Sequence, residues 1–322
     1  MVKKCLIFTF FIALLGWMVW TAGPAQLWSH LIAWNWVLVA CIAVWAVGYL
    51  LNAASFRLVI GCFMANDPAS ANHRTIGFRR LMSLTIGGYA LNYVTPFGLL
   101  GGEPWRIYRL RRLLPAADAN SAVVYYAMMH VCSHVIFWLI GLVYAFFALR
   151  GVLAVLLADV TDVVILVTVI ALVLLAIVIA FRVAVRKGWI RDLRTLLANH
   201  PKQFVGALAL ELASRMVNVA EFWLLLGVAF PGSEVAGYGA AYLVVAFSSL
   251  FANALFFSPM QLGTREGGIL LILQALLPAM TAGELLPWAI SISLATRIRE
   301  FFWIGAGLLM IAIGQKQEKD NK

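Results

Sequence analysis

Charged residues are scarce in this chain of 322 residues. Only 12% are Asp, Glu, Lys or Arg, whereas 63% are hydrophobic, and the mean hydropathy is +0.93. Soluble domains carry about 25% charged residues, so this chain cannot cover its apolar mass with a water-facing shell. The composition excludes a soluble globular domain, a disordered chain and a coiled coil. It predicts an all-α polytopic membrane protein.

Cysteine and known catalytic motifs are also nearly missing. The four cysteines show no metal-ligand spacing and are expected to be buried free thiols; they are Cys5, Cys41, Cys62 and Cys132. No nucleophile elbow, phosphate-binding P-loop or GxGxxG turn occurs. His130 and His134 are four residues apart on a predicted helix, but no third ligand stands at a suitable offset. We expect no metal, no cofactor and no enzymatic activity.

Basic residues outnumber acidic ones, and the net charge is +10. In a soluble protein this balance would suggest a nucleic-acid partner. In a membrane protein it indicates basic residues retained on the cytoplasmic face, beside anionic lipid headgroups. We therefore expect a membrane lipid as partner and no nucleic acid.

Six apolar runs are long enough to cross about 30 Å of hydrocarbon. They lie at approximately 6–22, 35–61, 120–149, 160–182, 203–230 and 286–313. The first run resembles a signal peptide, but it is long, contains Trp17 and Trp20, and lacks a small-residue cleavage site after it. We predict that it is a retained span.

Two further apolar stretches, 76–112 and 238–279, are interrupted by Pro and Gly. Each interruption has a hydroxyl residue followed by Pro, Leu three residues after the Pro, and Glu seven residues after it. Pro and Gly break helices, and broken backbone at membrane depth needs protein or water to satisfy it. We predict two re-entrant hairpins whose tips contain Pro96, Gly101, Gly102, Pro259, Gly263, Gly267 and Gly268. Two unrelated kinks in ordinary spans are the alternative.

The predicted order of spans and hairpins describes an inverted repeat within a single transmembrane domain, 1–322. The first repeat covers 5–150, the second 160–313, and 314–322 form a cytoplasmic tail. Most Lys and Arg residues then fall on the side of both termini, and the opposite side keeps only Arg150. The stretch 182–202 is either a short helix on the headgroups or a solvated basic loop. Paired discontinuous elements in inverted repeats are typical of secondary transporters.

Ten charged residues lie at apparent membrane depth, apart from Arg57, which can reach the interface. They are Glu103, Arg106, Glu211, Arg215, Glu221, Arg265, Glu266, Arg297, Arg299 and Glu300. At about 3 kcal/mol each, their exposure to lipid would cost on the order of 30 kcal/mol, more than the roughly 5–15 kcal/mol that stabilises a fold. They must face inward and pair, or line a wet cavity.

Helical spacing suggests some of the pairs. Glu211, Arg215 and Asn218 share one stripe, and Glu103 and Arg106, like Arg297 and Glu300, are three residues apart. Arginine forks bind phosphate bidentately, so we predict a site for a lipid phosphate headgroup. Its predicted contacts are Arg106, Arg215, Arg265, Arg297 and Asn218. Charge-pairing or coupling roles fall to Glu103, Glu211, Glu221, Glu266, Arg299 and Glu300. A purely structural salt-bridge network is the alternative.

At these residues the chain resembles the family built on the transmembrane, flippase-like domain of lysylphosphatidylglycerol synthase. The resemblance covers about 5–313 and rests on two hairpin motifs and on Arg297. The motifs are Pro96 with Gly101, Gly102, Glu103 and Arg106, and Pro259 with the run from Leu262 to Gly268. It implies an inner-membrane protein of bacteria that moves lipids between leaflets. Bifunctional members carry a soluble aminoacyl-transferase domain after the membrane part, and that activity is not implied here.

These observations predict a flippase-like lipid transporter that carries an anionic or phosphate-bearing lipid, including glycolipids, by alternating access. Two alternatives stay open. One is a membrane-embedded transferase that acts on a lipid-linked substrate, and the other is a membrane partner of a cytoplasmic lipid-modifying enzyme.

Overall fold

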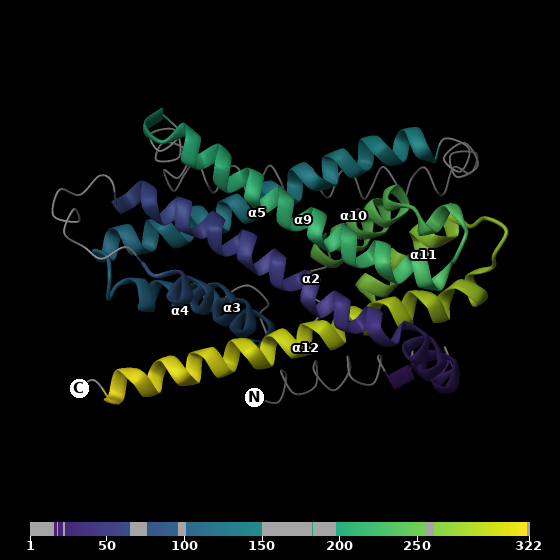
Figure 1. Ribbon diagram of the computed structural model, residues 1–322. Coiled ribbons are helices and arrows are strands. Elements are labelled where there is room, and N and C mark those ends of the chain that lie inside the picture. The colour runs from purple at the N-terminus through teal and green to yellow at the C-terminus, as the bar shows by residue number, and fades with distance from the viewer. Residues whose placement is uncertain are drawn as a thin grey trace.

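The computed structural model describes residues 16–17, 19–21, 23–64, 76–95, 101–149, 182, 198–254 and 261–320. The described part is a bundle of helices without strands (Figure 1). Its main helices are α2 (Pro24–Met64), α3 (Phe78–Val94), α4 (Gly102–Leu110), α5 (Ala116–Ala148), α9 (Pro201–Ala229), α10 (Tyr238–Ala254), α11 (Thr264–Leu276) and α12 (Ala282–Asp320). A 3₁₀ turn, η2 (Glu234–Ala236), precedes α10. The architecture confirms the prediction of an all-α polytopic membrane protein.

Four helices are long and apolar enough to cross a membrane: α2, α5, α9 and Ala282–Lys316 of α12. In the same order, they correspond to the predicted spans 35–61, 120–149, 203–230 and 286–313. Only α2 begins much earlier than predicted, and its backbone kinks at Asn35, where the apolar run was expected to start. The predicted spans 6–22 and 160–182 and the stretch 182–202 lie mostly outside the described residues.

The described residues of each interrupted stretch include two short helices that pack against each other. In the first, α3 is followed by α4, and the α4 N-terminus is capped by Asn92, whose Oδ1 accepts a hydrogen bond from Gly102 N at 2.7 Å. In the second, α10 is followed by α11, and the Glu266 carboxylate accepts a hydrogen bond from Gly263 N at 2.8 Å. Pro96 and Pro259 lie outside the described residues.

Glycine permits the close approach of the two helices in each stretch. A Cβ atom on Gly102 would lie 2.1 Å from the Gly88 carbonyl oxygen, and one on Gly268 would lie 2.8 Å from Ser248 Cα. Small residues that let backbones approach are characteristic of helix contacts in membranes. The glycines predicted at the tips therefore include residues that determine how tightly each helix pair packs.

The contacts between helices repeat between the two halves of the chain. The helices α2, α3, α4 and α5 of the first half have α9, α10, α11 and α12 as their counterparts in the second half. For each prominent contact between two of these helices, the two counterpart helices are also in contact in the described structure. Thus α3 packs on α12 as α10 packs on α5, and α2 packs directly on its counterpart α9. This pattern is what a two-fold repeat predicts.

The counterpart helices also run in opposite directions. In Figure 1, α2 and α12 run from right to left, whereas α5 and α9 run from left to right. The α3–α4 pair lies in the left half of the bundle and the α10–α11 pair in the right half. Two hairpins that enter a membrane from opposite faces would have this arrangement. Their re-entry stays a prediction.

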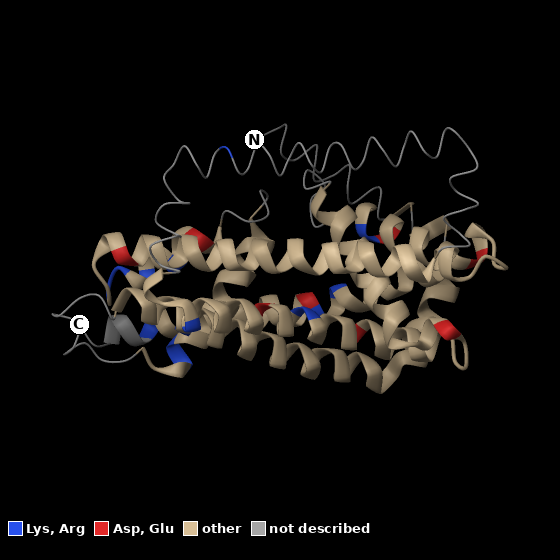
Figure 2. Ribbon diagram, turned by 90° about the horizontal axis from the view of Figure 1, so that it is seen from above, with Lys and Arg blue, Asp and Glu red and all other residues tan. Residues whose placement is uncertain are grey.

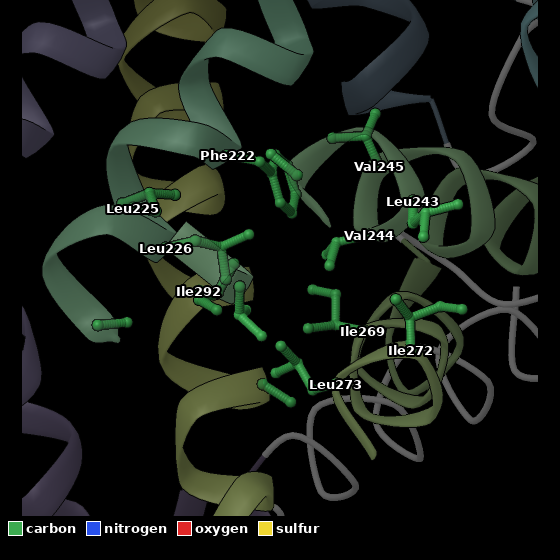
Figure 3. Close-up of a cluster of buried hydrophobic side chains, with 14 of the residues drawn as sticks. Phe222, Leu225, Leu226, Leu243, Val244, Val245, Ile269, Ile272, Leu273 and Ile292 are labelled. Atoms are coloured by element: carbon green, nitrogen blue, oxygen red, sulfur yellow. The ribbon is translucent and has the colours of Figure 1, made fainter. Parts of the chain in front are cut away.

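An apolar cluster joins the second half of the bundle. Figure 3 shows Phe222, Leu225 and Leu226 of α9 facing side chains of α10, α11 and α12. The labelled partners are Leu243, Val244, Val245, Ile269, Ile272, Leu273 and Ile292. Large exposed apolar side chains lie on the outside of α5, among them Ile140, Phe146 and Phe147. Such a surface suits contact with lipid.

We predict that Gly102→Val destabilises the protein, because its Cβ would collide with the α3 backbone and force α4 away. Overpacking of this kind costs about 1–3 kcal/mol, so the thermal unfolding temperature in detergent should fall by several degrees. Gly305→Val is the matched control, because a Cβ at Gly305 of α12 meets no atom within 4 Å. Equal unfolding temperatures for the two variants would contradict the close packing of α3 on α4.

Candidate functional site

All ten charges predicted at membrane depth lie in the described part, and each is within 4 Å of an opposite charge. Figure 2 shows acidic and basic residues together in the middle of the bundle, away from its ends. Three groups can be distinguished by position. We call them the first-hairpin pair (Glu103, Arg106), the histidine cluster (His130, Ser133, Glu211, Arg215) and the second-hairpin cluster (Glu221, Arg265, Glu266, Arg297, Arg299, Glu300).

The first-hairpin pair is a saturated ion pair. Arg106 of α4 is 2% exposed and lies 2.7 Å from Glu103, one helical turn earlier. Its remaining donors bind the carbonyl oxygens of Leu84 and Thr85 on α3, both at 3.2 Å. The guanidinium also lies 5.1 Å from the centre of the Tyr89 ring, a stabilising cation–π distance. With its donors engaged in this way, Arg106 fastens α4 to α3.

The histidine cluster lies between α5 and α9. Glu211 is fully buried, and its Oε2 lies 2.8 Å from His130 Nδ1. Arg215, one turn further along α9, lies 3.8 Å from the same carboxylate, which is too far for a hydrogen bond. Instead, Arg215 Nη2 contacts His130 Nε2 at 3.2 Å and Ser133 Oγ at 3.2 Å.

Arg215 differs from the other buried arginines because its ion pair is long. Its Nη1 makes no hydrogen bond to any described residue, and its side chain remains 13% exposed. The neighbouring His130 side chain is 22% exposed. This cluster therefore offers an accessible cationic fork at mid-depth. No group of three His, Cys, Asp or Glu side chains that could hold a metal occurs among the described residues.

The second-hairpin cluster joins α11 to α12 through two ion pairs. Glu266 Oε1 lies 2.7 Å from Arg297 Nη2 and also accepts a hydrogen bond from Ser293. Arg265 Nη1 lies 2.8 Å from Glu300 Oε1, and its Nη2 donates to Gln261 at 2.7 Å. Both carboxylates are buried, at 2% and 8% exposure. These contacts hold the N-terminus of α11 against α12.

Arg299 extends this cluster to α9 and α2. Its Nε lies 3.0 Å from Glu221 Oε1, and its Nη2 lies 3.5 Å from Glu300 Oε1. Its guanidinium carbon lies 3.8 Å from the centre of the Trp45 ring on α2. One arginine is thus shared between two carboxylates and an aromatic face.

Two tyrosines of α3 connect the clusters. Tyr89 OH lies 3.3 Å from His130 Nδ1, and Tyr93, one turn later, donates to Glu300 Oε1 at 3.5 Å. The histidine cluster and the second-hairpin cluster therefore border the same stretch of α3.

Spacing along a helix predicts only part of this pairing. Glu103 and Arg106 do pair, but Arg297 and Glu300, although three residues apart, take partners on α11. Asn218 Oδ1 is buried and has no hydrogen-bond partner among the described residues, so it accepts no hydrogen bond from the arginines there.

Several contact residues were not singled out from the sequence. Ser293 and Thr296 stand on the same polar stripe as Arg297 and Glu300, and Ser133 is three residues from His130. Hydroxyl residues at helical spacing from a buried charge were the signal that could have revealed them. Tyr93 carries no comparable signal.

We predict that Arg297→Gln strongly destabilises the protein, because it leaves the buried Glu266 carboxylate without its countercharge. Breaking a buried pair on one side costs about 3–5 kcal/mol. The double variant Arg297→Gln with Glu266→Gln should recover much of that loss, because no uncompensated charge remains. Thermal unfolding in detergent measures both, with Arg57→Gln as a control for losing an arginine on α2. A double variant less stable than the single one would contradict the pairing.

Comparison with known protein families gave one match over almost the whole chain. The family described as the lysylphosphatidylglycerol synthase TM region matches residues 2–305. Comparisons with curated proteins and with solved structures gave no match. The match covers both interrupted helix pairs and all ten buried charges, in agreement with the resemblance seen in the sequence. The chain therefore belongs to the family of the lysylphosphatidylglycerol synthase TM region, a family of membrane proteins.

Proposed function

We propose that this protein moves an anionic or phosphate-bearing lipid between the two leaflets of the bacterial inner membrane. Membership in the lysylphosphatidylglycerol synthase TM region family supports a lipid-related role in a membrane. The observation that carries the proposal is the incomplete pairing of Arg215 at mid-depth. A cationic fork with a free Nη1 group, beside a partly exposed histidine, is suited to a phosphate oxygen.

The other arginines suit structural roles better. Arg106, Arg265 and Arg297 each have a carboxylate at 2.7–2.8 Å. Arg106 and Arg265 also donate further hydrogen bonds to neighbouring oxygens. A headgroup would have to displace those carboxylates before it could bind there. We therefore assign the first headgroup contact to Arg215, with His130 and Ser133 beside it, and keep Arg106, Arg265 and Arg297 as supports of the two helix pairs.

The exchange of contacts between the two halves supports alternating access. When two similar half-structures pack against each other in opposite orientation, rocking of one against the other opens a central site to either side. The α3–α4 pair and the α10–α11 pair would then act as gates on opposite faces. The histidine cluster and the second-hairpin cluster, both bordered by α3, would be the fixed site.

The distribution of charge at the two ends supports an orientation with both termini in the cytoplasm. In Figure 1 the C-terminus lies at the same end of the bundle as the start of α3, the end of α4 and the start of α9. These helix ends and the residues beside them include Arg79, Arg80, Arg109, Arg111, Arg112, Lys202 and Lys316. At the opposite end, where α9 ends and α12 begins in Figure 1, Glu234 lies in η2 and Glu284 in the first turn of α12. Basic loops stay on the cytoplasmic side.

We predict that Arg215→Gln slows lipid movement at least tenfold, because a charge-assisted hydrogen bond contributes about 1.5–3 kcal/mol. The full chain would be reconstituted into liposomes that contain phosphatidylglycerol with a fluorescent acyl chain. Loss of fluorescence on adding dithionite outside then reports movement between leaflets. Arg215→Lys, which keeps the charge, should retain more activity than Arg215→Gln.

Arg57→Gln is the matched control, because Arg57 is an exposed arginine of α2 outside all three charge groups. It should move lipid at the wild-type rate. Wild-type rates equal to those of protein-free liposomes, for anionic and zwitterionic lipids alike, would refute the transport function. Equal rates for wild type and Arg215→Gln would refute only the role given to Arg215.

A further inference from the structure

In the part of the chain that the structure describes, Glu221 is the buried glutamate whose two carboxylate oxygens both lack a hydrogen-bond partner. Glu103, Glu211, Glu266 and Glu300 each take part in at least one hydrogen bond. Glu221 lies on α9, is 0% exposed, and has one ionic contact, to Arg299 at 3.0 Å. Because Arg299 Nε itself lacks a hydrogen bond, this contact is a close approach of charges rather than a formed hydrogen bond.

The groups that face Glu221 come from four helices. On α12 they are Arg299 and the next residue, Glu300, and on α11 Arg265 adds a second positive charge nearby. On α2 the thiol of Cys41 lies near both Glu221 and Arg299. On α9 itself, Asn218 presents a buried oxygen without a partner one turn earlier.

Among the described residues, the remaining neighbours of α9 contribute no countercharge to Glu221. Helix α10 contains no Asp, Glu, Lys or Arg. The histidines of α5, His130 and His134, interact with Arg215 and with each other. Within the described part of the chain, Arg299, which Glu300 also contacts, is therefore the nearest positive charge to Glu221.

The second-hairpin cluster is electrically balanced only when Glu221 is ionised. It contains three arginines, Arg265, Arg297 and Arg299, against the carboxylates of Glu221, Glu266 and Glu300. Because a buried carboxylate without hydrogen bonds is costly to keep ionised, Glu221 is the acidic group of the cluster that accepts a proton with the least loss of other contacts. Its protonation leaves one positive charge in excess.

We propose that Glu221 is a proton-binding site, and that its protonation frees the charge of Arg299 for an anionic lipid headgroup. The carboxylate takes up one proton and becomes a neutral carboxylic acid, while Arg299 keeps Glu300 and the Trp45 ring as partners. The excess positive charge is then neutralised by the headgroup. A proton and an anionic lipid bind together, and their joint movement transfers no net charge.

Proton binding by Glu221 can be tested without any transport measurement. Infrared difference spectra between acidic and alkaline pH would be recorded on the full chain in a maltoside detergent, which has no carbonyl group. We expect the carbonyl band of a protonated carboxylic acid to appear as the pH falls, to be absent in Glu221→Gln, and to persist in Glu234→Gln, a change at an exposed loop glutamate. Identical bands in the wild type and Glu221→Gln would overturn the proposal.

A chemical probe tests proton binding by Glu221 in the wild-type protein, without any substitution. Dicyclohexylcarbodiimide reacts with protonated carboxyl groups in apolar surroundings, and mass spectrometry locates the product. We expect modification of Glu221 that decreases as the pH rises, and none at Glu266, whose carboxylate is held by Arg297 and Ser293. Modification of Glu266 without modification of Glu221 would overturn the proposal.

The coupling to lipid rests on the proposed function and is tested separately. Liposomes with fluorescent phosphatidylglycerol and a gradient of one pH unit should accumulate labelled lipid about tenfold in the leaflet on the alkaline side, since one unit corresponds to about 1.4 kcal/mol. Glu221→Gln should abolish the accumulation. If the wild-type protein moves lipid but the pH gradient causes no accumulation, the coupling is overturned while the lipid-transport function is not. Absence of any lipid movement would overturn both, while the infrared bands would still decide proton binding.

Discussion

The structure depends on the pairing of charges that the hydrocarbon does not tolerate. Each buried arginine and glutamate at mid-depth finds an opposite charge in the described part. Most of these pairs connect different helices: Glu266 and Arg265 of α11 bind Arg297 and Glu300 of α12, and Glu221 of α9 meets Arg299. The charges therefore do more than avoid lipid. They fix short helices that are not long enough to span the membrane alone.

Interrupted helices also need partners for their freed backbone groups, and the same polar residues supply them. Asn92 caps α4 through Gly102 N, and Glu266 caps α11 through Gly263 N while it also binds Arg297. A single carboxylate thus satisfies a helix end and neutralises an arginine. In a medium without water each such role is worth several kcal/mol.

The charged groups of the network differ in how completely they are paired. This difference separates groups with a structural role from groups that can bind a ligand or a proton. Arg106 and Arg297 are held by short ion pairs, whereas Arg215 has a carboxylate at 3.8 Å and a free nitrogen. Glu221 lacks hydrogen bonds although it is fully buried. Saturated pairs resist exchange because breaking them leaves a bare buried charge. The incompletely paired groups can take a ligand or a proton without that loss, and both proposals rest on them.

The sequence by itself determined the class of the protein, four of its spans, the two interruptions and the requirement that its buried charges face inward. These follow from local quantities: hydropathy over about 20 residues, the helix-breaking properties of Pro and Gly, and the cost of charge in lipid. It also indicated the Glu103–Arg106 pair, because residues three apart on a helix are neighbours. Only the tertiary structure decided that Arg297 binds Glu266 rather than Glu300, and that Arg215 and Glu221 are incompletely paired. Pairing across helices depends on how those helices rotate and approach one another, and spacing along one helix does not specify this.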